Sequence, residues 1–338
     1  MQRVPFTVSF DAMNTLIQVT CGLGYQYLTS YASFLQRHGI DLRSSCPNAT
    51  SGMMHDAALK AISDQVLVDR AAWTRSADPK EMPIGGNTDE ELRSFWTRVL
   101  KQTYNCATLY DGASPNVVRR VKALWSNHQE VERFMDYMLF DQFASSKAHN
   151  WCPEGLNTLQ RLCEWNQKQT GREKGATPSS PRVATPAFAS SSTDSTSSTP
   201  SPLFLATPPF VVTNADSRMR DVFSQLGAFD VGASGEPPLL AGIISARDVG
   251  YAKPSPAGIL AGVRDAAASY RAACQSGGGG SEPGVDIRLH VHVGDADADR
   301  VACERAGCHY VQCDPVTGAT WELLHAKLQE LQASCRGG

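Results

Sequence analysis

Short apolar runs alternate with helical patterns through the second half of the chain, and this alternation constrains the fold more than any other feature. Four runs are predicted to be buried strands: 209–213, 239–245, 288–294 and 309–313. Helical patterns occur at three places: a segment with Met219, Val222, Phe223 and Leu226 on one face, a segment from about Asp299, and a segment from Trp321 to Leu331. Buried strands that alternate with helices are typical of a doubly wound parallel sheet. The sequence therefore predicts an α/β fold with a Rossmann-like core.

The first half of the chain opens on one more apolar run, which begins by about residue 5 and ends at Phe10. No strong strand pattern follows between residues 17 and 150. Apolar residues instead recur at helical spacing in five segments: 25–39, 54–68, 89–104, 117–125 and 131–143. A further helix is predicted from Pro153 to about Lys168. We therefore predict an all-helical domain over residues 17–149, inserted into an α/β core formed by residues 1–16 and 150–338.

Two segments have the composition of surface loops. Residues 175–202 are rich in Ser, Thr and Pro and carry few large apolar side chains, so they are expected to be disordered. Residues 275–284 are rich in glycine. Surface insertions cost little free energy, so a tolerated insertion is favoured at both places over a phosphorylation site or a tether. Protein contacts through the Ser/Thr/Pro-rich loop remain the alternative.

Composition excludes several classes of protein. The net charge of −3 over 338 residues gives no electrostatic footprint for nucleic acid, and no apolar run approaches the length of a membrane span. The ten cysteines are scattered and include no CxxC pair, which favours reduced thiols. The first predicted strand begins too early to leave room for a signal peptide. We therefore expect a cytoplasmic protein with a small-molecule substrate, and neither a nucleic acid nor a membrane as partner.

Chemically active side chains stand where the predicted strands end. The carboxyl ends of neighbouring parallel strands meet at one edge of a sheet, and ligands bind in the crevice there. Six residues are placed at that edge: Asp11 after the first strand, Thr213 and Asn214 after the second, Lys253 in the loop after the third, and Asp295 and Asp299 after the fourth.

These groups, in this order, resemble the four motifs of the haloacid dehalogenase (HAD) superfamily. The matching stretches are Phe10-Asp11 with Asn14-Thr15-Leu16, Val211-Val212-Thr213-Asn214, Lys253-Pro254-Ser255-Pro256, and His292-Val293-Gly294-Asp295 with Asp299 and Ala306-Gly307. The resemblance covers residues 5–16 and about 203–315, and Asn14 stands where related first motifs carry glycine. It implies that the helical insertion is a cap domain.

The resemblance also implies a role for each residue. Asp11 is the expected nucleophile, which forms a covalent aspartyl intermediate. Thr213 and Asn214 are expected to bind the phosphoryl group, and Lys253 to neutralise charge on the nucleophile and on the transferring group.

A magnesium site is implied at the same place. The carboxylates of Asp11, Asp295 and Asp299 and the carbonyl of Met13 would supply the hard oxygen ligands that Mg²⁺ prefers. Asp297, which lies between the two acidic residues, is expected to face solvent. His290 and His292 alternate along one strand and could suggest a metal pair, but satisfied core histidines are the favoured interpretation.

Met13 stands where phosphatases of this family usually carry a second Asp, which protonates the leaving group and then activates water. A thioether can do neither, and general acid–base catalysis contributes about 10²–10⁴-fold. The first interpretation is a slow or specialised Mg²⁺-dependent phosphoric-ester hydrolase. The second is a 2-haloacid dehalogenase-type hydrolase, for which no carboxylate-binding Arg is apparent in the sequence. The third is a non-catalytic binding or regulatory module that retains the fold.

Overall fold

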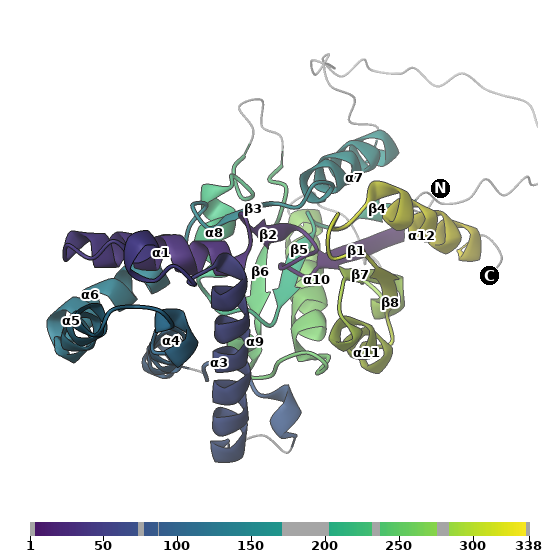
Figure 1. The fold of residues 1–338 in the computed structure, drawn as a ribbon. Helices are drawn as coiled ribbons and strands as arrows, with labels where there is room; N and C mark the ends of the chain where they lie inside the picture. Colours follow the sequence, from purple (N-terminus) through teal and green to yellow (C-terminus); the bar gives the residue numbers. More distant parts are fainter. Residues whose placement is uncertain are drawn as a thin grey trace, which may run out of the picture.

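The computed structural model describes residues 4–73, 78–86, 88–170, 203–231, 237–275 and 284–335. The loop predicted at 175–202 and the interior of the loop predicted at 275–284 lie outside these residues. The described part combines a parallel sheet flanked by helices with a group of helices beyond one end of the sheet (Figure 1).

A six-stranded parallel sheet forms the α/β part, with β1 (Val4–Phe10) at its centre. The strand order is β6-β5-β1-β7-β8, and β4 also pairs with β1. The other strands are β4 (Leu203–Leu205), β5 (Phe210–Thr213), β6 (Gly242–Ser245), β7 (His290–Gly294) and β8 (His309–Gln312). On one side of β1 lie β5 and then β6, and on the other side lie β7 and then β8, so the chain fills each side of the sheet from the centre outward. The predicted doubly wound parallel sheet is thereby confirmed.

Helices cover both faces of this sheet. One face packs against α7 (Gly155–Thr170), α8 (Met219–Gln225) and α12 (Trp321–Ser334). The other packs against α10 (Ala257–Gln275) and α11 (Asp297–Ala306). Helix α10 lies so close to the sheet that a Cβ on Gly262 would stand 2.0 Å from the Phe210 ring, so only glycine fits there.

Side chains of β1 alternate between the two faces, as the strand period requires. Val8 and Phe10 belong to the large apolar cluster beneath α7, α8 and α12. Thr7 and Ser9 are buried on the opposite face, where they contact two histidines of β7. The centre of the sheet therefore has an apolar face and a face with a buried polar stripe.

A helical segment, residues 23–142, lies between β2 (Ile17–Val19) and β3 (His149–Trp151). Its helices are α1 (Leu23–Arg37), α2 (Leu42–Ser45), α3 (Ser51–Ala72), α4 (Asp89–Tyr104), α5 (Pro115–Ser126) and α6 (His128–Asp136), with short turns of helix at Pro79–Glu81, Ala107–Tyr110 and Tyr137–Gln142. Stacked rings fill its separate core: the Tyr31 and Tyr104 rings lie 4.4 Å apart, and so do those of Phe34 and Phe134.

The expectation of no strand between residues 17 and 150 was wrong at both edges of that range. β2 and β3 pair antiparallel, with Val19 opposite His149. Each strand has three residues, too few for an alternating pattern to stand out in the sequence. The four predicted strands are also shorter than expected, β5 and β8 by one residue each. β6 begins at Gly242, and β7 begins at His290 because Ile287–Leu289 forms a 3₁₀ turn capped by Asp286.

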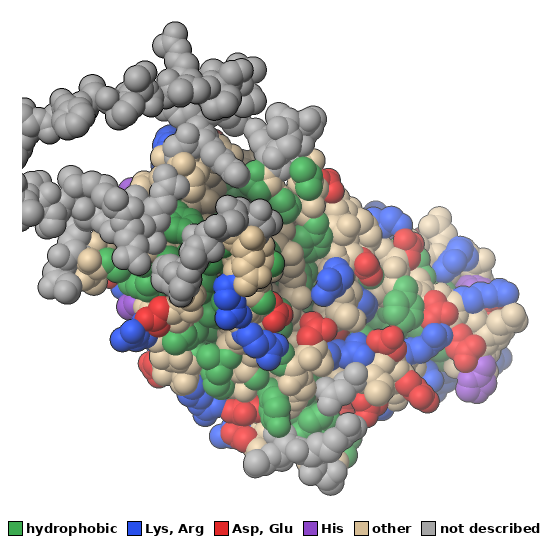
Figure 2. Space-filling view, turned by 180° about the vertical axis from the view of Figure 1, so that it is seen from behind, with side chains coloured by type: hydrophobic (Ala, Val, Ile, Leu, Met, Phe, Trp, Pro, Cys, Tyr) green, Lys and Arg blue, Asp and Glu red, His purple; other side chains and the backbone are tan. Residues whose placement is uncertain are grey.

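Charged side chains of both signs are mixed on the surface. On the face shown in Figure 2, outside the grey atoms, Lys and Arg lie among Asp and Glu rather than in one continuous patch. In the part of the chain that the structure describes, no helix combines the length and the hydropathy needed to cross a bilayer.

Candidate active site

The predicted site residues meet at the carboxyl edge of the sheet. Asp11 directly follows β1, Thr213 ends β5, and Asp295 directly follows β7. Asp299 lies in the first turn of α11, and Lys253 lies in the loop between α9 (Ala246–Val249) and α10. Since β5 and β7 are both direct neighbours of β1, the topology alone places the first three side by side.

Lys253 is the buried centre of charge in this cluster. Its Nζ lies 2.8 Å from Oδ1 of Asp11 and 2.5 Å from Oδ1 of Asp299, and it donates to the Val212 carbonyl at 2.9 Å. Its side chain is only 5% exposed. Burial alone would lower the pKa of Lys253, but the two carboxylates outweigh burial and raise the pKa above its ordinary value. Lys253 therefore stays protonated and compensates both acids.

The Asn214 and Thr213 side chains face the site, and they also make hydrogen bonds to the backbone of nearby loops. The Asn214 amide accepts from the Lys253 backbone N–H at 2.6 Å and donates to the Lys253 carbonyl at 3.0 Å. Its side chain thus fixes the lysine loop, and its predicted contact with phosphate remains a prediction. The Thr213 hydroxyl oxygen accepts from the Ala215 N–H at 3.1 Å, which leaves the hydroxyl proton available to a ligand.

Three carboxylates lie close enough to share a cation. Asp11, Asp295 and Asp299 offer oxygens that all lie within 4.8 Å of one another. Burial and then the nearby charge of Asp11 raise the pKa of Asp295. Asn14 donates to Asp295 at 3.4 Å. Unlike the other two, Asp299 is fully buried and engages protein groups through both oxygens, because Oδ2 accepts from the Ala296 N–H at 3.2 Å.

The two histidines of β7 form a buried hydrogen-bonded chain that ends on Asp299. The chain runs from Thr7 Oγ1 to His290 Nδ1 at 2.8 Å, from His290 Nε2 to Ser9 Oγ at 2.9 Å, from Ser9 Oγ to His292 Nδ1 at 2.7 Å, and from His292 Nε2 to Asp299 Oδ1 at 3.1 Å. Both imidazoles are fully buried. The interpretation of satisfied core histidines is therefore confirmed.

The charge on Asp299 fixes the direction of the last hydrogen bond in this chain. Burial alone would raise the pKa of Asp299, but the hydrogen bond from His292 and the charge of Lys253 hold it well below its usual value. The ionised carboxylate only accepts, so His292 donates through Nε2. The Ser9 hydroxyl bridges the two rings, and the Thr7 hydroxyl closes the far end of the chain on His290. Each hydrogen bond in such a buried chain polarises the next.

Met13 stands two residues after Asp11, where it packs against the apolar core and carries no titratable group. The next residue, Asn14, has φ of 56°, a left-handed conformation that Asn tolerates better than most residues. The turn therefore forms without the glycine that is common in related motifs. Asp297 lies at the surface, where its side chain is 78% exposed and pairs with Arg300, which confirms that it faces solvent.

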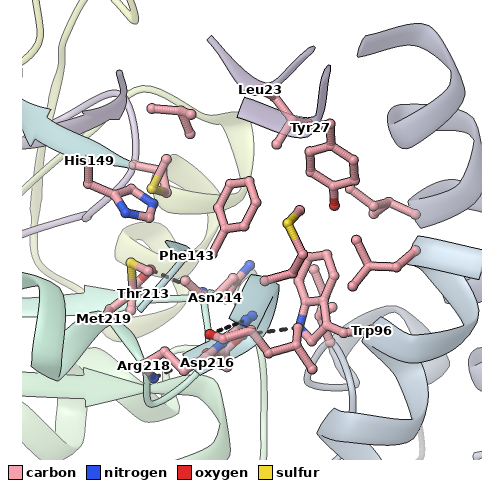
Figure 3. A pocket seen from close by; sticks show the side chains of 18 of the residues that line it. Leu23, Tyr27, Trp96, Phe143, His149, Thr213, Asn214, Asp216, Arg218 and Met219 are labelled. Atoms are coloured by element: carbon pink, nitrogen blue, oxygen red, sulfur yellow. Dashed lines mark hydrogen bonds and ion pairs between the residues drawn. The ribbon is translucent and has the colours of Figure 1, made fainter. Parts of the chain in front are cut away.

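A cavity of about 340 Å³ opens between these residues and the helical segment. Figure 3 shows its composition: the rings of Tyr27, Trp96 and Phe143 border it, and Thr213 and Asn214 lie at its sheet side. Asp11 and Met13 also line it. The nucleophile candidate therefore faces a space large enough for a small organic molecule.

Comparison with known proteins gives structural likeness alone. No protein-family model matches the sequence, and no curated protein is significantly similar to it. YfnB of Bacillus subtilis, a protein assigned to the HAD hydrolases whose structure holds magnesium, is 13% identical, with coverage of 97% of this chain and 100% of that one and a TM-score of 0.44.

Two further solved structures have similar sequence identities and coverages, and their TM-scores are also below 0.5. A 2-haloacid dehalogenase from Pseudomonas syringae pv. Tomato DC3000 is 15% identical, with 99% of both chains covered and a TM-score of 0.41. A predicted phosphoglycolate phosphatase from Haemophilus somnus is 15% identical, with coverage of 96% of this chain and 91% of that one and a TM-score of 0.35. At TM-scores below 0.5 these likenesses decide neither the fold nor the chemistry of this chain, which rest on its own strand order and side chains.

Sequence reasoning missed an ion pair in the cavity wall. Arg218 lies beside Asp216, with Nη2 to Oδ2 at 2.6 Å and Nε to Oδ1 at 2.7 Å, and its guanidinium covers the Trp96 ring. Trp96 in turn donates to Asp216 at 3.3 Å. The sequence does place Asp216 and Arg218 just beyond the end of a strand. Only the approach of α4 makes them part of a cavity.

Two more residues of the cavity wall were missed. His149 in β3 is buried, and its Nδ1 lies 3.2 Å from the Ser145 carbonyl. Burial lowers the pKa of His149, so the ring is neutral near pH 7. Tyr27 belongs to the core of the helical segment and also lines the cavity. A lone His and a helical Tyr carry no sequence signal that separates these roles.

The acidic cluster suits a hard divalent cation. Asp11 and Asp295 retain carboxylate oxygens beside one another, and a cation between them would offset their like charges. Asp299 is a weaker ligand candidate than the sequence suggests, since its oxygens already serve Lys253, His292 and the Ala296 N–H.

Proposed function

We propose that this chain is a HAD-like hydrolase that cleaves phosphoric monoesters with Mg²⁺ through an aspartyl intermediate on Asp11. The observation that carries the proposal is the Asp11 carboxylate, 14% exposed at the cavity, held 2.8 Å from the buried ammonium of Lys253. A carboxylate that opens on a ligand cavity beside a fixed positive charge is suited to attack an anionic phosphoryl group.

The reaction divides into two displacements at phosphorus. In the first, an Asp11 oxygen forms a bond to phosphorus, the ester P–O bond breaks, and the leaving group departs with the electron pair as an oxyanion. In the second, water bonds to phosphorus and the bond to Asp11 breaks, which releases inorganic phosphate. The proton lost by water neutralises the oxyanion, so ester and water yield alcohol and phosphate.

Residues of the chain supply the surrounding electrostatics. Lys253 offsets charge on Asp11, and Thr213, which lines the cavity, would donate to a phosphoryl oxygen. Asp11, Asp295 and the Met13 carbonyl would hold Mg²⁺, with Asp299 positioning Lys253. When bound, Mg²⁺ lowers the cost of bringing a phosphate dianion next to carboxylates.

Acetyl phosphate tests this proposal, because its leaving group needs no proton. With Mg²⁺ we expect phosphate release, a hydroxylamine-labile radiolabel on the peptide that contains Asp11, and a loss of at least about tenfold on adding EDTA. Release that EDTA leaves unchanged, or that proceeds without label on Asp11, contradicts the proposal. Halide release from 2-haloacids without a metal would instead support the dehalogenase alternative.

That alternative needs a cation to bind the substrate carboxylate. Arg218 is the one arginine among the described residues that line the cavity, and Asp216 already neutralises it through two contacts. The ion pair therefore favours the phosphate reaction. Absence of turnover with both substrate classes would favour the binding or regulatory module.

Met13→Asp is expected to raise turnover of alkyl phosphates by about 10²-fold, because it restores a group that can protonate the leaving alkoxide and activate water. Phosphate release from an alkyl ester with and without the substitution measures the effect. Met13→Leu is the matched control and should leave the rate unchanged. An equal rate in the Asp and wild-type proteins would mean that another group already moves this proton.

A further inference from the structure

The wall of the cavity is unusually apolar for a site that handles phosphate. Aromatic and aliphatic side chains from the helical segment, and from Phe143 directly after it, form one side of the cavity; among them are Tyr27, Ile62, Trp96, Leu100 and Met138. In Figure 3 the rings of Tyr27 and Trp96 border the space on the side away from Thr213, and the Phe143 ring lies between them and Asn214. A ligand bound at Asp11 would therefore extend into apolar surroundings with ring faces and edges available for contact.

Among the described residues of this wall, no positive charge is free to bind a second anionic group of a substrate. Of the described lining residues, Arg218 is the only Lys or Arg, and its guanidinium contacts both oxygens of Asp216. Lys253 is saturated by Asp11, Asp299 and the Val212 carbonyl. His149 is buried, and its Nδ1 faces the Ser145 carbonyl. An anionic tail on the substrate would lose its hydration without gaining a counterion.

The residues at the Asp11 end of the cavity limit which leaving groups can depart from phosphorus. Met13 occupies the position beside Asp11 and offers no proton. An alkoxide leaves poorly without protonation, whereas an aryloxide is stabilised by its ring and departs as the anion. The lack of a proton donor at position 13 disfavours alkyl esters and therefore favours aryl esters.

We propose that the substrate is an aryl phosphate monoester with an uncharged aromatic body, which the Tyr27, Trp96 and Phe143 rings receive. This inference rests on the proposed phosphate chemistry at Asp11 and adds the class of the group that is cleaved from it. The aromatic body occupies the cavity, and the phosphoryl group lies among Asp11, Thr213 and Lys253.

Paired substrates separate the charge of the tail from the quality of the leaving group. We expect kcat/KM for phenyl and naphthyl phosphate to exceed that for para-carboxyphenyl phosphate by at least about tenfold, although the carboxylated phenol is the better leaving group. Equal or higher kcat/KM for the carboxylated ester overturns the inference.

A substitution in the wall tests the location of the aromatic body. Ile62→Trp fills cavity space from α3 and should lower the ratio of kcat/KM for naphthyl phosphate to that for acetyl phosphate by about tenfold. Leu59→Trp is the matched control, since Leu59 lies on the same helix, is 48% exposed and does not line the cavity. Its ratio should stay within about twofold of wild type. An unchanged ratio in Ile62→Trp overturns the assignment of the cavity.

Acetyl phosphate and a binding measurement keep the two proposals distinguishable. If acetyl phosphate is hydrolysed through Asp11 but aryl esters show no preference, the inference fails and the proposed function stands. If no phosphate is hydrolysed, the proposed function fails, and calorimetry with naphthylmethylphosphonate decides the inference. Binding that Ile62→Trp weakens and Leu59→Trp does not would retain the aromatic site. Absence of binding to the wild-type protein would overturn it.

Discussion

Replacement of Asp11 by asparagine is expected to lower phosphate release by at least about 10³-fold, since the amide cannot attack phosphorus and no second nucleophile replaces it. The substitution keeps the shape of the side chain and removes one negative charge from a cluster that contains Asp295 and Asp299. The fold should therefore remain intact. Initial rates with acetyl phosphate, measured beside thermal unfolding of the same preparation, separate loss of chemistry from loss of structure.

Asp297→Asn is the matched control for this variant. Asp297 lies on α11 two residues before Asp299, but its side chain is 78% exposed and pairs with Arg300 at the surface. Its substitution should leave the rate unchanged. A rate for Asp11→Asn within about tenfold of wild type would exclude Asp11 as the nucleophile.

Replacement of Lys253 by methionine is expected to lower the free energy of unfolding by about 3–5 kcal/mol, because it leaves the buried carboxylates without a counterion. Asp299 is fully buried, and the Lys253 ammonium lies 2.5 Å from it. The Val212 carbonyl also loses its donor. Denaturant titration near neutral pH, where Asp299 is ionised, measures the change.

A double variant shows whether the loss arises from the uncompensated charge. Asn at position 299 has no charge to compensate, so Lys253→Met with Asp299→Asn should be more stable than the sum of the two single changes predicts. Lys60→Met is a surface control, since Lys60 is 74% exposed and pairs with Asp64; it should change stability by less than about 0.5 kcal/mol. Strict additivity in the double variant would show that Lys253 and Asp299 stabilise the fold independently.

Much of the candidate site could be predicted from the sequence because parallel strands impose their own geometry. Each strand of the core is a short apolar run, and a strand that ends in a polar residue must present it at the carboxyl edge. Asp11, Thr213 and Asp295 meet for this reason alone. The position of Lys253 was predicted only through its motif, since no strand ends there.

Features that depend on tertiary approach had no local signal. The cavity forms because α1, α3 and α4 lie over the sheet edge, and the amphipathic pattern of a helix does not tell which partner its apolar face meets. For a similar reason, the sequence did not indicate which residues contact Asp299. His292 and Lys253 are far from each other in the chain, and only the folded loops bring both to one carboxylate.

The polar stripe beneath α10 and α11 also links the order of synthesis to the assembly of the surroundings of Asp11. Thr7 and Ser9 pair in register with His290 and His292, although 283 residues separate the members of each pair. β1 is made first, yet every strand that flanks it begins at Leu203 or later. The hydroxyls of β1 consequently meet their imidazoles only after β7 has been made, and contacts so distant in sequence slow folding. A chain that ends before β7 would carry Asp11 but neither the acids nor the histidine chain beside it, so a product of synthesis that stops there cannot hold the assembled candidate site.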